Sequence, residues 1–183
     1  MIWLGICLFF GLHLLPSLPN VRESLIDRLG EKRYKGGYAL LSLGGLVLIT
    51  LGYSEVPYQE LWVSPVWASH LAFAVMPVVF VLLVAAEMKG HIRRTVKHPM
   101  LIGIFLWGCV HLVNNGDTAS LYLFGAFALF SVFAIISSNR RSKDRTDYTP
   151  KGRHDLIALV LGTVLFVGVL WAHTFLFGVT PTL

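Results

Sequence analysis

The sequence predicts an all-α fold: a polytopic membrane bundle of six transmembrane helices. Of the 183 residues, 55% are hydrophobic and 14% are charged, whereas a soluble domain carries about 25% charged residues. The apolar residues form six runs, and all 15 Lys and Arg residues lie in three of the connections between these runs. We expect a single integral membrane domain that covers residues 1–183.

The basic residues also predict the orientation of the bundle. Five Lys and Arg residues separate the first and second runs, four separate the third and fourth, and six separate the fifth and sixth. Because basic connections stay on the cytoplasmic side of a membrane, both termini are expected on the opposite side. The basic loops then face anionic lipid headgroups. They are short and carry no interleaved stacking aromatics, which argues against nucleic-acid binding.

The first run, about Ile2 to Pro19, is expected to remain as a helix. No basic residue precedes it and no small-residue cleavage site follows it, so it does not have the pattern of a removed signal peptide. The segment from Arg22 to Lys35 alternates in charge around a few apolar residues, which predicts an amphipathic helix at the interface or a solvated cap. The helix at the interface is preferred because the segment connects two spans. The second run is about Tyr38 to Tyr53, and its Gly44 and Gly45 would let a neighbouring helix approach closely.

The third and fourth runs are joined by a basic connection that ends at Lys97. The third run is about Trp67 to Ala86, and the fourth is about Pro99 to Val113. A helix of the fourth run would be about 22 Å long, shorter than a hydrocarbon core of about 30 Å. We therefore expect either that its flanking residues enter the membrane or that this helix is buried inside the bundle.

The fifth and sixth runs complete the predicted bundle. Asp117 and Thr118 are N-cap candidates for the fifth run, about Ser120 to Ser137. The most polar segment of the chain, Asn139 to His154, follows it. The sixth run is about Leu156 to Phe177.

Histidines in the apolar runs are the candidate functional residues. An ionisable side chain in hydrocarbon is costly and by default indicates a functional site. Three interpretations remain open: haem ligation by histidines of facing helices, a proton relay, or hydrogen bonding across a helix interface. His91 and His154 lie among basic loop residues and are expected to be solvated. The five histidines in or at the ends of apolar runs are His13, His70, His98, His111 and His173.

His111 is the leading candidate because it lies inside the fourth run. At about 100° per residue it shares a helix face with Trp107 and Asn114, whereas Cys109 points away by roughly 200°. A Cys–His metal site on this helix alone is therefore not expected, and Cys109 is interpreted as a small packed residue. The chain shows no zinc-ligand spacing, no recognisable Ser-His-Asp arrangement and no phosphate-binding glycine loop.

Three segments resemble the NnrU family of bacterial membrane proteins, which is named for nitrite and nitric oxide reductase gene clusters. They are FFGLHLLPSLPNVRESLIDRLGEKRYKGGYALLSLGGL near the start, RRTVKHPMLIGIFLWGCVHLVNNGDTASLYLFG in the middle and AHTFLFGVTP at the end. The family is similar to the plant and cyanobacterial 15-cis-zeta-carotene isomerases, which hold haem b through histidines. This resemblance implies that haem b is bound here, with His13 in FGLHLLPS and His111 in WGCVH as the iron ligands. Further candidates for contact with the cofactor are His70, His98, His173 and Trp107.

The resemblance implies a multi-pass protein of the bacterial inner membrane that acts in nitrite and nitric oxide reduction, or as a redox-linked, isomerase-like enzyme. The alternative is a non-enzymatic accessory or assembly protein for a nitrogen-oxide reductase, which the absence of a complete catalytic constellation favours.

KHPMLIG is also similar to the RHP-x-x-x-G segment of isoprenylcysteine carboxyl methyltransferases, which bind S-adenosylmethionine. Those enzymes have a later Glu-rich segment, whereas Asn139–His154 contains no Glu, so this interpretation ranks last.

Overall fold

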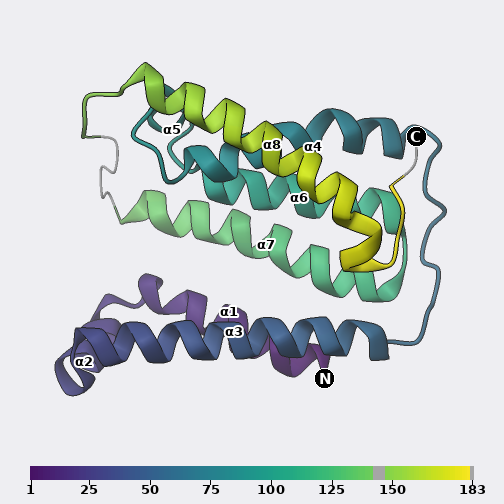
Figure 1. Ribbon diagram of the computed structural model, residues 1–183. Coiled ribbons are helices and arrows are strands. Elements are labelled where there is room, and N and C mark those ends of the chain that lie inside the picture. Colours follow the sequence, from purple (N-terminus) through teal and green to yellow (C-terminus); the bar gives the residue numbers. More distant parts are fainter. Residues whose placement is uncertain (142–146, 182–183) are drawn as a thin grey trace. The chain divides into compact units, whose positions relative to one another are not determined.

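A computed structural model describes residues 1–141 and 147–181 (Figure 1). Within these residues the secondary structure is helical, apart from one isolated β-bridge between Glu60 and Asp117. The chain divides into two compact units. The first comprises Met1–Leu61 and Asp117–Ala126, and the second comprises Trp62–Gly116 and the chain from Phe127 onward. Part of the predicted polar segment, residues 142–146, lies outside the described residues.

In the first unit, α1 (Ile2–Leu14) and α2 (Pro19–Leu29) are separated by a short 3-10 turn, Leu15–Ser17. The helix axis bends by 99° between them. Pro16 lies in the 3-10 turn and Pro19 begins α2. Because proline has no N–H and favours the first turn of a helix, the two prolines end one helix and start the next. The first apolar run therefore forms α1 and the turn that follows it.

The charged segment from Arg22 to Lys35 does not form the single amphipathic helix that we expected. Gly30 has a φ of +78°, a left-handed conformation that glycine adopts without steric penalty. It separates α2 from α3 (Glu31–Glu55). The charged residues after Gly30 therefore extend the helix of the second run, which begins seven residues before the predicted start at Tyr38.

Glycines bring α1 and α3 close together in the first unit. A Cβ atom added to Gly5 of α1 would lie 2.5 Å from the Ile49 amide nitrogen of α3, and one added to Gly45 would lie 3.0 Å from Phe9. Gly45 thus serves the close approach that the sequence predicted. Gly44 does not, because a Cβ atom there would meet nothing within 4 Å.

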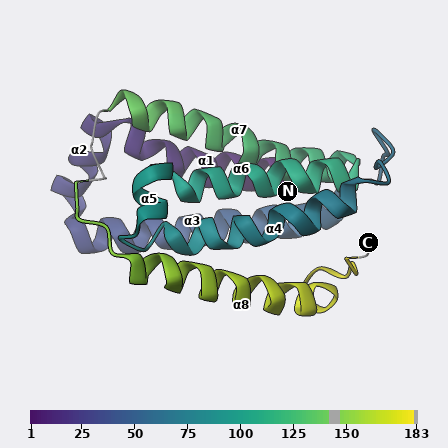
Figure 2. The same cartoon turned by 90° about the horizontal axis from the view of Figure 1, so that it is seen from above.

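In the second unit, α4 (Ala68–Ala85) packs against both α6 (Pro99–Asn115) and α8 (Gly152–Phe177). Figure 2 shows α6 and α8 on either side of α4. Glycine again permits the contact: a Cβ atom on Gly162 of α8 would lie 2.7 Å from the Val81 backbone of α4. The basic connection after α4 contains a short helix, α5 (His91–Val96), that the sequence did not predict.

The remaining helix, α7 (Thr118–Arg140), begins in the first unit and continues into the second. Asp117 is the N-cap residue, as expected: its Oδ1 accepts the Ser120 backbone N–H at 3.0 Å and its Oδ2 accepts the Ser120 hydroxyl at 2.6 Å. The Ser120 hydroxyl also lies 2.9 Å from the Tyr53 hydroxyl, which ties the end of α3 to the start of α7.

Several of these helices have the length and composition of membrane spans. Four qualify individually, α3, α4, α7 and α8, and the bent pair of α1 and α2 makes up to five if it counts as one span. The shorter α6 is also apolar. Large apolar side chains of α8 are exposed on the surface of the structure; Trp171 is 86% exposed and Phe175 is 93% exposed. Because such a surface is unfavourable in water, we conclude that this is a multi-pass membrane protein.

Replacing Gly5 with Ala should lower the stability of the protein by about 1–3 kcal/mol, because the added methyl group meets the α3 backbone. Gly11→Ala is the matched control on the same helix, since a Cβ atom there meets nothing within 4 Å. Thermal unfolding in detergent, followed by the loss of the monodisperse elution peak, measures both variants. Equal midpoints for the two variants would contradict the close packing of α1 on α3.

Candidate functional site

His13 lies in the last turn of α1 and is half-buried. Its Nδ1 is 2.7 Å from the carbonyl oxygen of Phe9, four residues earlier on the same helix. The imidazole also stacks on the Phe9 ring, with centroids 4.2 Å apart, and lies 5.5 Å from the ring of Tyr38 on α3. Residues of both packed helices of the first unit therefore hold this imidazole in place.

His111 has the same arrangement on α6 of the second unit. Its Nδ1 is 2.8 Å from the carbonyl oxygen of Trp107, again four residues earlier. The two rings lie 5.3 Å apart, and Trp107 in turn contacts the edge of Phe127 on α7 at 5.5 Å. One turn further on, Asn114 donates its side-chain N–H to the Ala68 carbonyl of α4 at 3.2 Å. The helix face that the sequence predicted for Trp107, His111 and Asn114 is thus in contact with neighbouring helices.

These contacts determine which ring nitrogen carries the proton. A carbonyl oxygen only accepts hydrogen bonds, so the Nδ1 atoms of His13 and His111 must be the donors. In the neutral ring the lone pair then lies on Nε2. A metal-bound histidine typically donates one ring N–H to a carbonyl or carboxylate and coordinates with the other nitrogen. The donor chemistry of both side chains therefore fits an axial iron ligand.

His173, near the end of α8, has its Nδ1 2.7 Å from the carbonyl oxygen of Val179. His173 and His111 line one cavity of about 90 Å³ between α4, α6 and α8. The structure thus brings together two of the predicted histidines within the second unit, whereas His13 belongs to the first unit.

Two further candidates lie in other surroundings. His70 of α4 is exposed. His98 is the residue before α6, and its Nε2 lies 2.7 Å from the Asn139 side-chain oxygen on α7. His98 therefore makes this contact through Nε2, whereas His13 and His111 each bond a backbone carbonyl through Nδ1.

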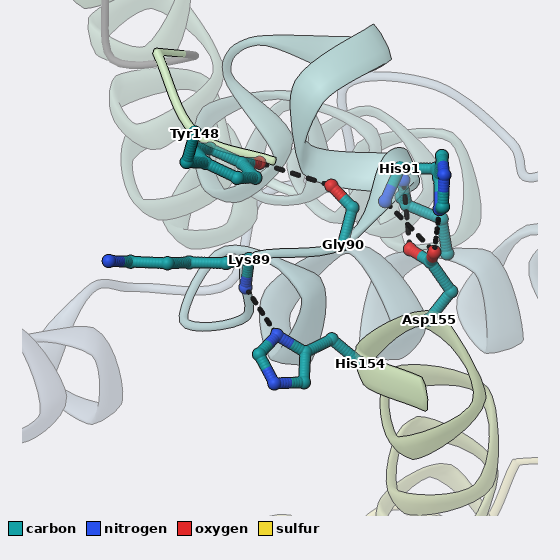
Figure 3. A network of polar contacts seen from close by, with 7 residues as sticks. Lys89, Gly90, His91, Tyr148, His154 and Asp155 are labelled. Atoms are coloured by element: carbon teal, nitrogen blue, oxygen red, sulfur yellow. Dashed lines mark hydrogen bonds and ion pairs between the residues drawn. The ribbon is translucent and has the colours of Figure 1, made fainter. Parts of the chain in front are cut away.

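A polar network that the sequence did not predict joins the start of α8 to the connection between α4 and α5 (Figure 3). Asp155 accepts the backbone N–H groups of His91 and Ile92, both at 2.9 Å, and the His91 ring N–H at 2.7 Å. Asp155 precedes the apolar part of α8. Partial burial raises the pKa of the Asp155 carboxyl, but these three hydrogen bonds outweigh it and hold the pKa below its usual range.

His154 and Tyr148 complete this network. The Lys89 backbone N–H donates to His154 Nδ1 at 3.1 Å, and the Tyr148 hydroxyl donates to the Gly90 carbonyl at 3.1 Å. The expectation that His91 and His154 are merely solvated is therefore incomplete, because both hold α8 in place. An Asp in the first turn of a helix was the available sequence signal, although nothing in the sequence indicated its partners.

Other side chains that could bind a metal ion do not cluster within the described residues 1–141 and 147–181. No group of three or more His, Cys, Asp or Glu side chains there could hold a metal ion. Cys7 is exposed and Cys109 is partly buried, and neither forms a disulfide. A haem iron needs only two side-chain ligands. His13 and His111, whose Nδ1 atoms each bond the carbonyl oxygen four residues earlier on an apolar helix, therefore remain the candidate site.

Comparisons with known proteins identify the family. Neither the curated proteins nor the solved structures that we compared with this chain give a match. A family model described as NnrU protein matches residues 1–181, nearly the whole chain. The predicted resemblance is thereby confirmed, and the chain belongs to the NnrU family.

Proposed function

We propose that this NnrU-family membrane protein binds haem b through His13 and His111, and that it serves the reduction of nitrite and nitric oxide or a redox-linked isomerisation. The observation that carries the proposal is the shared bonding of the two imidazoles. In each, Nδ1 donates to the carbonyl oxygen four residues earlier, at 2.7 Å for His13 and 2.8 Å for His111. Both therefore have the tautomer that an axial ligand requires.

The surroundings of the two rings support this role. A hydrogen bond from Nδ1–H to a carbonyl oxygen raises the basicity of Nε2 and fixes the ring orientation. Phe9 stacks on His13 and Trp107 contacts His111, so each ring is also held by an aromatic neighbour. An apolar environment favours the neutral imidazole over the imidazolium, because burying an isolated charge is expensive. A neutral, oriented imidazole is the form that coordinates iron.

His13 and His111 would hold the haem, and bound haem would supply one-electron exchange. The cavity that His111 lines is not the haem pocket in this proposal. A pocket for a cofactor or drug-sized ligand has about 300–1,000 Å³, several times the cavity's volume of about 90 Å³. The small cavity beside His111 is therefore available to a different, smaller ligand.

We further propose that the protein spans the bacterial inner membrane six times, with both termini on the non-cytoplasmic side. Six spans result if α1 and the short α6 are added to the four long apolar helices. The support comes from the basic residues, because all 15 lie in the three connections that this arrangement places in the cytoplasm or in the helix ends that adjoin them. The other two connections carry no Lys or Arg.

Purified protein from haem-supplemented cells should show a Soret band, and His111→Gly should lower the haem affinity at least about tenfold, because one axial ligand is lost. His13→Gly should do the same. The absorption spectrum and the haem-to-protein ratio provide the measurement. Free imidazole added to either variant should restore the band, since it can occupy the vacated ligand position.

His70 of α4 is exposed, so in this proposal it does not contact the haem, although the sequence offered it as a further candidate. His70→Gly is therefore the comparison variant and should retain the haem of the wild type. A wild-type protein without haem would contradict the proposal and favour the accessory-protein alternative. A Soret band that persists in both His13→Gly and His111→Gly would overturn the assignment of the ligands. Circular dichroism and a monodisperse elution peak establish that each variant has folded.

Reporter fusions test the orientation. Alkaline phosphatase, which is active only outside the cytoplasm, should be active when fused after Leu183 and inactive when inserted in the basic connection at Thr95. A fluorescent protein that matures only in the cytoplasm should give the opposite pattern. Activity of the phosphatase at Thr95, or its absence at the C-terminus, would contradict the six-span arrangement.

A further inference from the structure

A small, partly open cavity lies in the second unit, between α4, α6 and α8. Its volume is about 90 Å³. The described residues that line it are mostly apolar, and the two histidines, His111 and His173, are the only polar side chains among them. The apolar walls include Ala72, Phe73, Met76 and Phe80 of α4 and Phe166 and Leu170 of α8.

The cavity wall offers no group that would hold an anion. The imidazole N–H of His111 is donated to the Trp107 carbonyl, and that of His173 is donated to the Val179 carbonyl. No Lys, Arg, Ser, Thr or amide side chain is among the described lining residues. An ion in such surroundings would lose its hydration without a compensating donor or counter-charge, which is prohibitively costly.

The volume limits the ligand as strongly as the chemistry does. A cavity needs only about 10–15 Å³ of accessible space to hold one water molecule, and an engineered apolar cavity of about 150 Å³ takes up benzene or xenon. At about 90 Å³, this cavity has room for a molecule of a few heavy atoms. Its apolar wall favours an uncharged ligand over water, because water needs two to four polar partners.

The C-terminal segment helps to close this cavity. Gly178 has a φ of +72° and ends α8 with a left-handed turn, so the chain folds back on the helix. The hydrogen bond between His173 and Val179 and a second one at 3.0 Å between Thr174 and Thr180 fix the returning segment. Pro181 is then part of the cavity wall. His173, which lines the cavity, thus also holds the segment that contributes Pro181 to the cavity wall.

We propose that this cavity is a binding site for a small, uncharged, weakly polar molecule, held beside His111. Naming the natural ligand rests on the proposed function. Of the nitrogen oxides considered there, neutral nitric oxide matches the cavity in size and charge, and anionic nitrite does not. The cavity then selects a neutral ligand from the membrane, where apolar gases are more soluble than ions.

Two heavy probes of different charge test the site by anomalous diffraction from crystals of the full chain grown in a lipid phase. Xenon under pressure represents the neutral ligand, and bromide represents an anion. Xenon should give an anomalous peak between Ala72, Met76 and His173, and bromide should give none there. Ala72→Leu should abolish the xenon peak by filling the cavity, whereas Val78→Leu, at an exposed position of the same helix, should retain it.

Three outcomes would overturn the proposal: bromide bound in the cavity, no xenon there in the wild type, or a lipid acyl chain in its place. The diffraction result is independent of haem, because xenon binding requires no iron. A protein without a Soret band that still binds xenon would refute the proposed function and leave this inference intact. A haem-loaded protein with no xenon in the cavity would refute this inference and leave the proposed function intact.

Discussion

A hydrogen bond from an imidazole N–H to a carbonyl oxygen of its own helix determines the chemistry of the candidate site. Hydrocarbon contains no water to accept that N–H, so the protein must supply an acceptor itself. For both His13 and His111, the acceptor is the carbonyl oxygen of the residue four positions earlier on the same helix. Because Nδ1 carries the proton in this bond, the lone pair of the neutral ring lies on Nε2. The hydrogen bond that satisfies the N–H group in apolar surroundings therefore also gives Nε2 the form that can bind a metal.

The helix packing positions each imidazole. Gly45 allows α3 to approach α1 at Phe9, and Phe9 supplies both the stacking ring and the carbonyl acceptor for His13. On α6, Trp107 supplies the ring and the acceptor for His111, while Asn114 binds the Ala68 carbonyl of α4. In each unit, the residues that orient the histidine and the residues that contact the neighbouring helix therefore lie close together on the same helix.

Features with a local cause could be predicted from the sequence. Long apolar runs, Pro99 at the start of α6 and Asp117 at the start of α7 give helix positions within a few residues, because composition and capping act over one or two turns. The pairing of Trp107 with His111 follows from helix geometry alone. The choice of Gly45 over Gly44 for helix contact did not follow, since both lie in one apolar run and only the partner helix distinguishes them.

Features that depend on distant partners could not be predicted. Asp155 binds the backbone around His91, more than 60 residues away in sequence, and no periodicity encodes that contact. His111 and His173 line one cavity because α4 packs against both α6 and α8. The break at Gly30 was missed because the alternating charges on both sides resemble one continuous amphipathic helix, whereas a single positive φ separates two.

Nitrogen-15 NMR of histidine-labelled, haem-free protein in lipid tests the central claim most directly, because the chemical shifts of the two ring nitrogens report which one is protonated. His→Asn variants at positions 13 and 111 assign the signals. We predict that both rings carry a proton on Nδ1 and none on Nε2. A protonated Nε2 or an imidazolium at either position would contradict it.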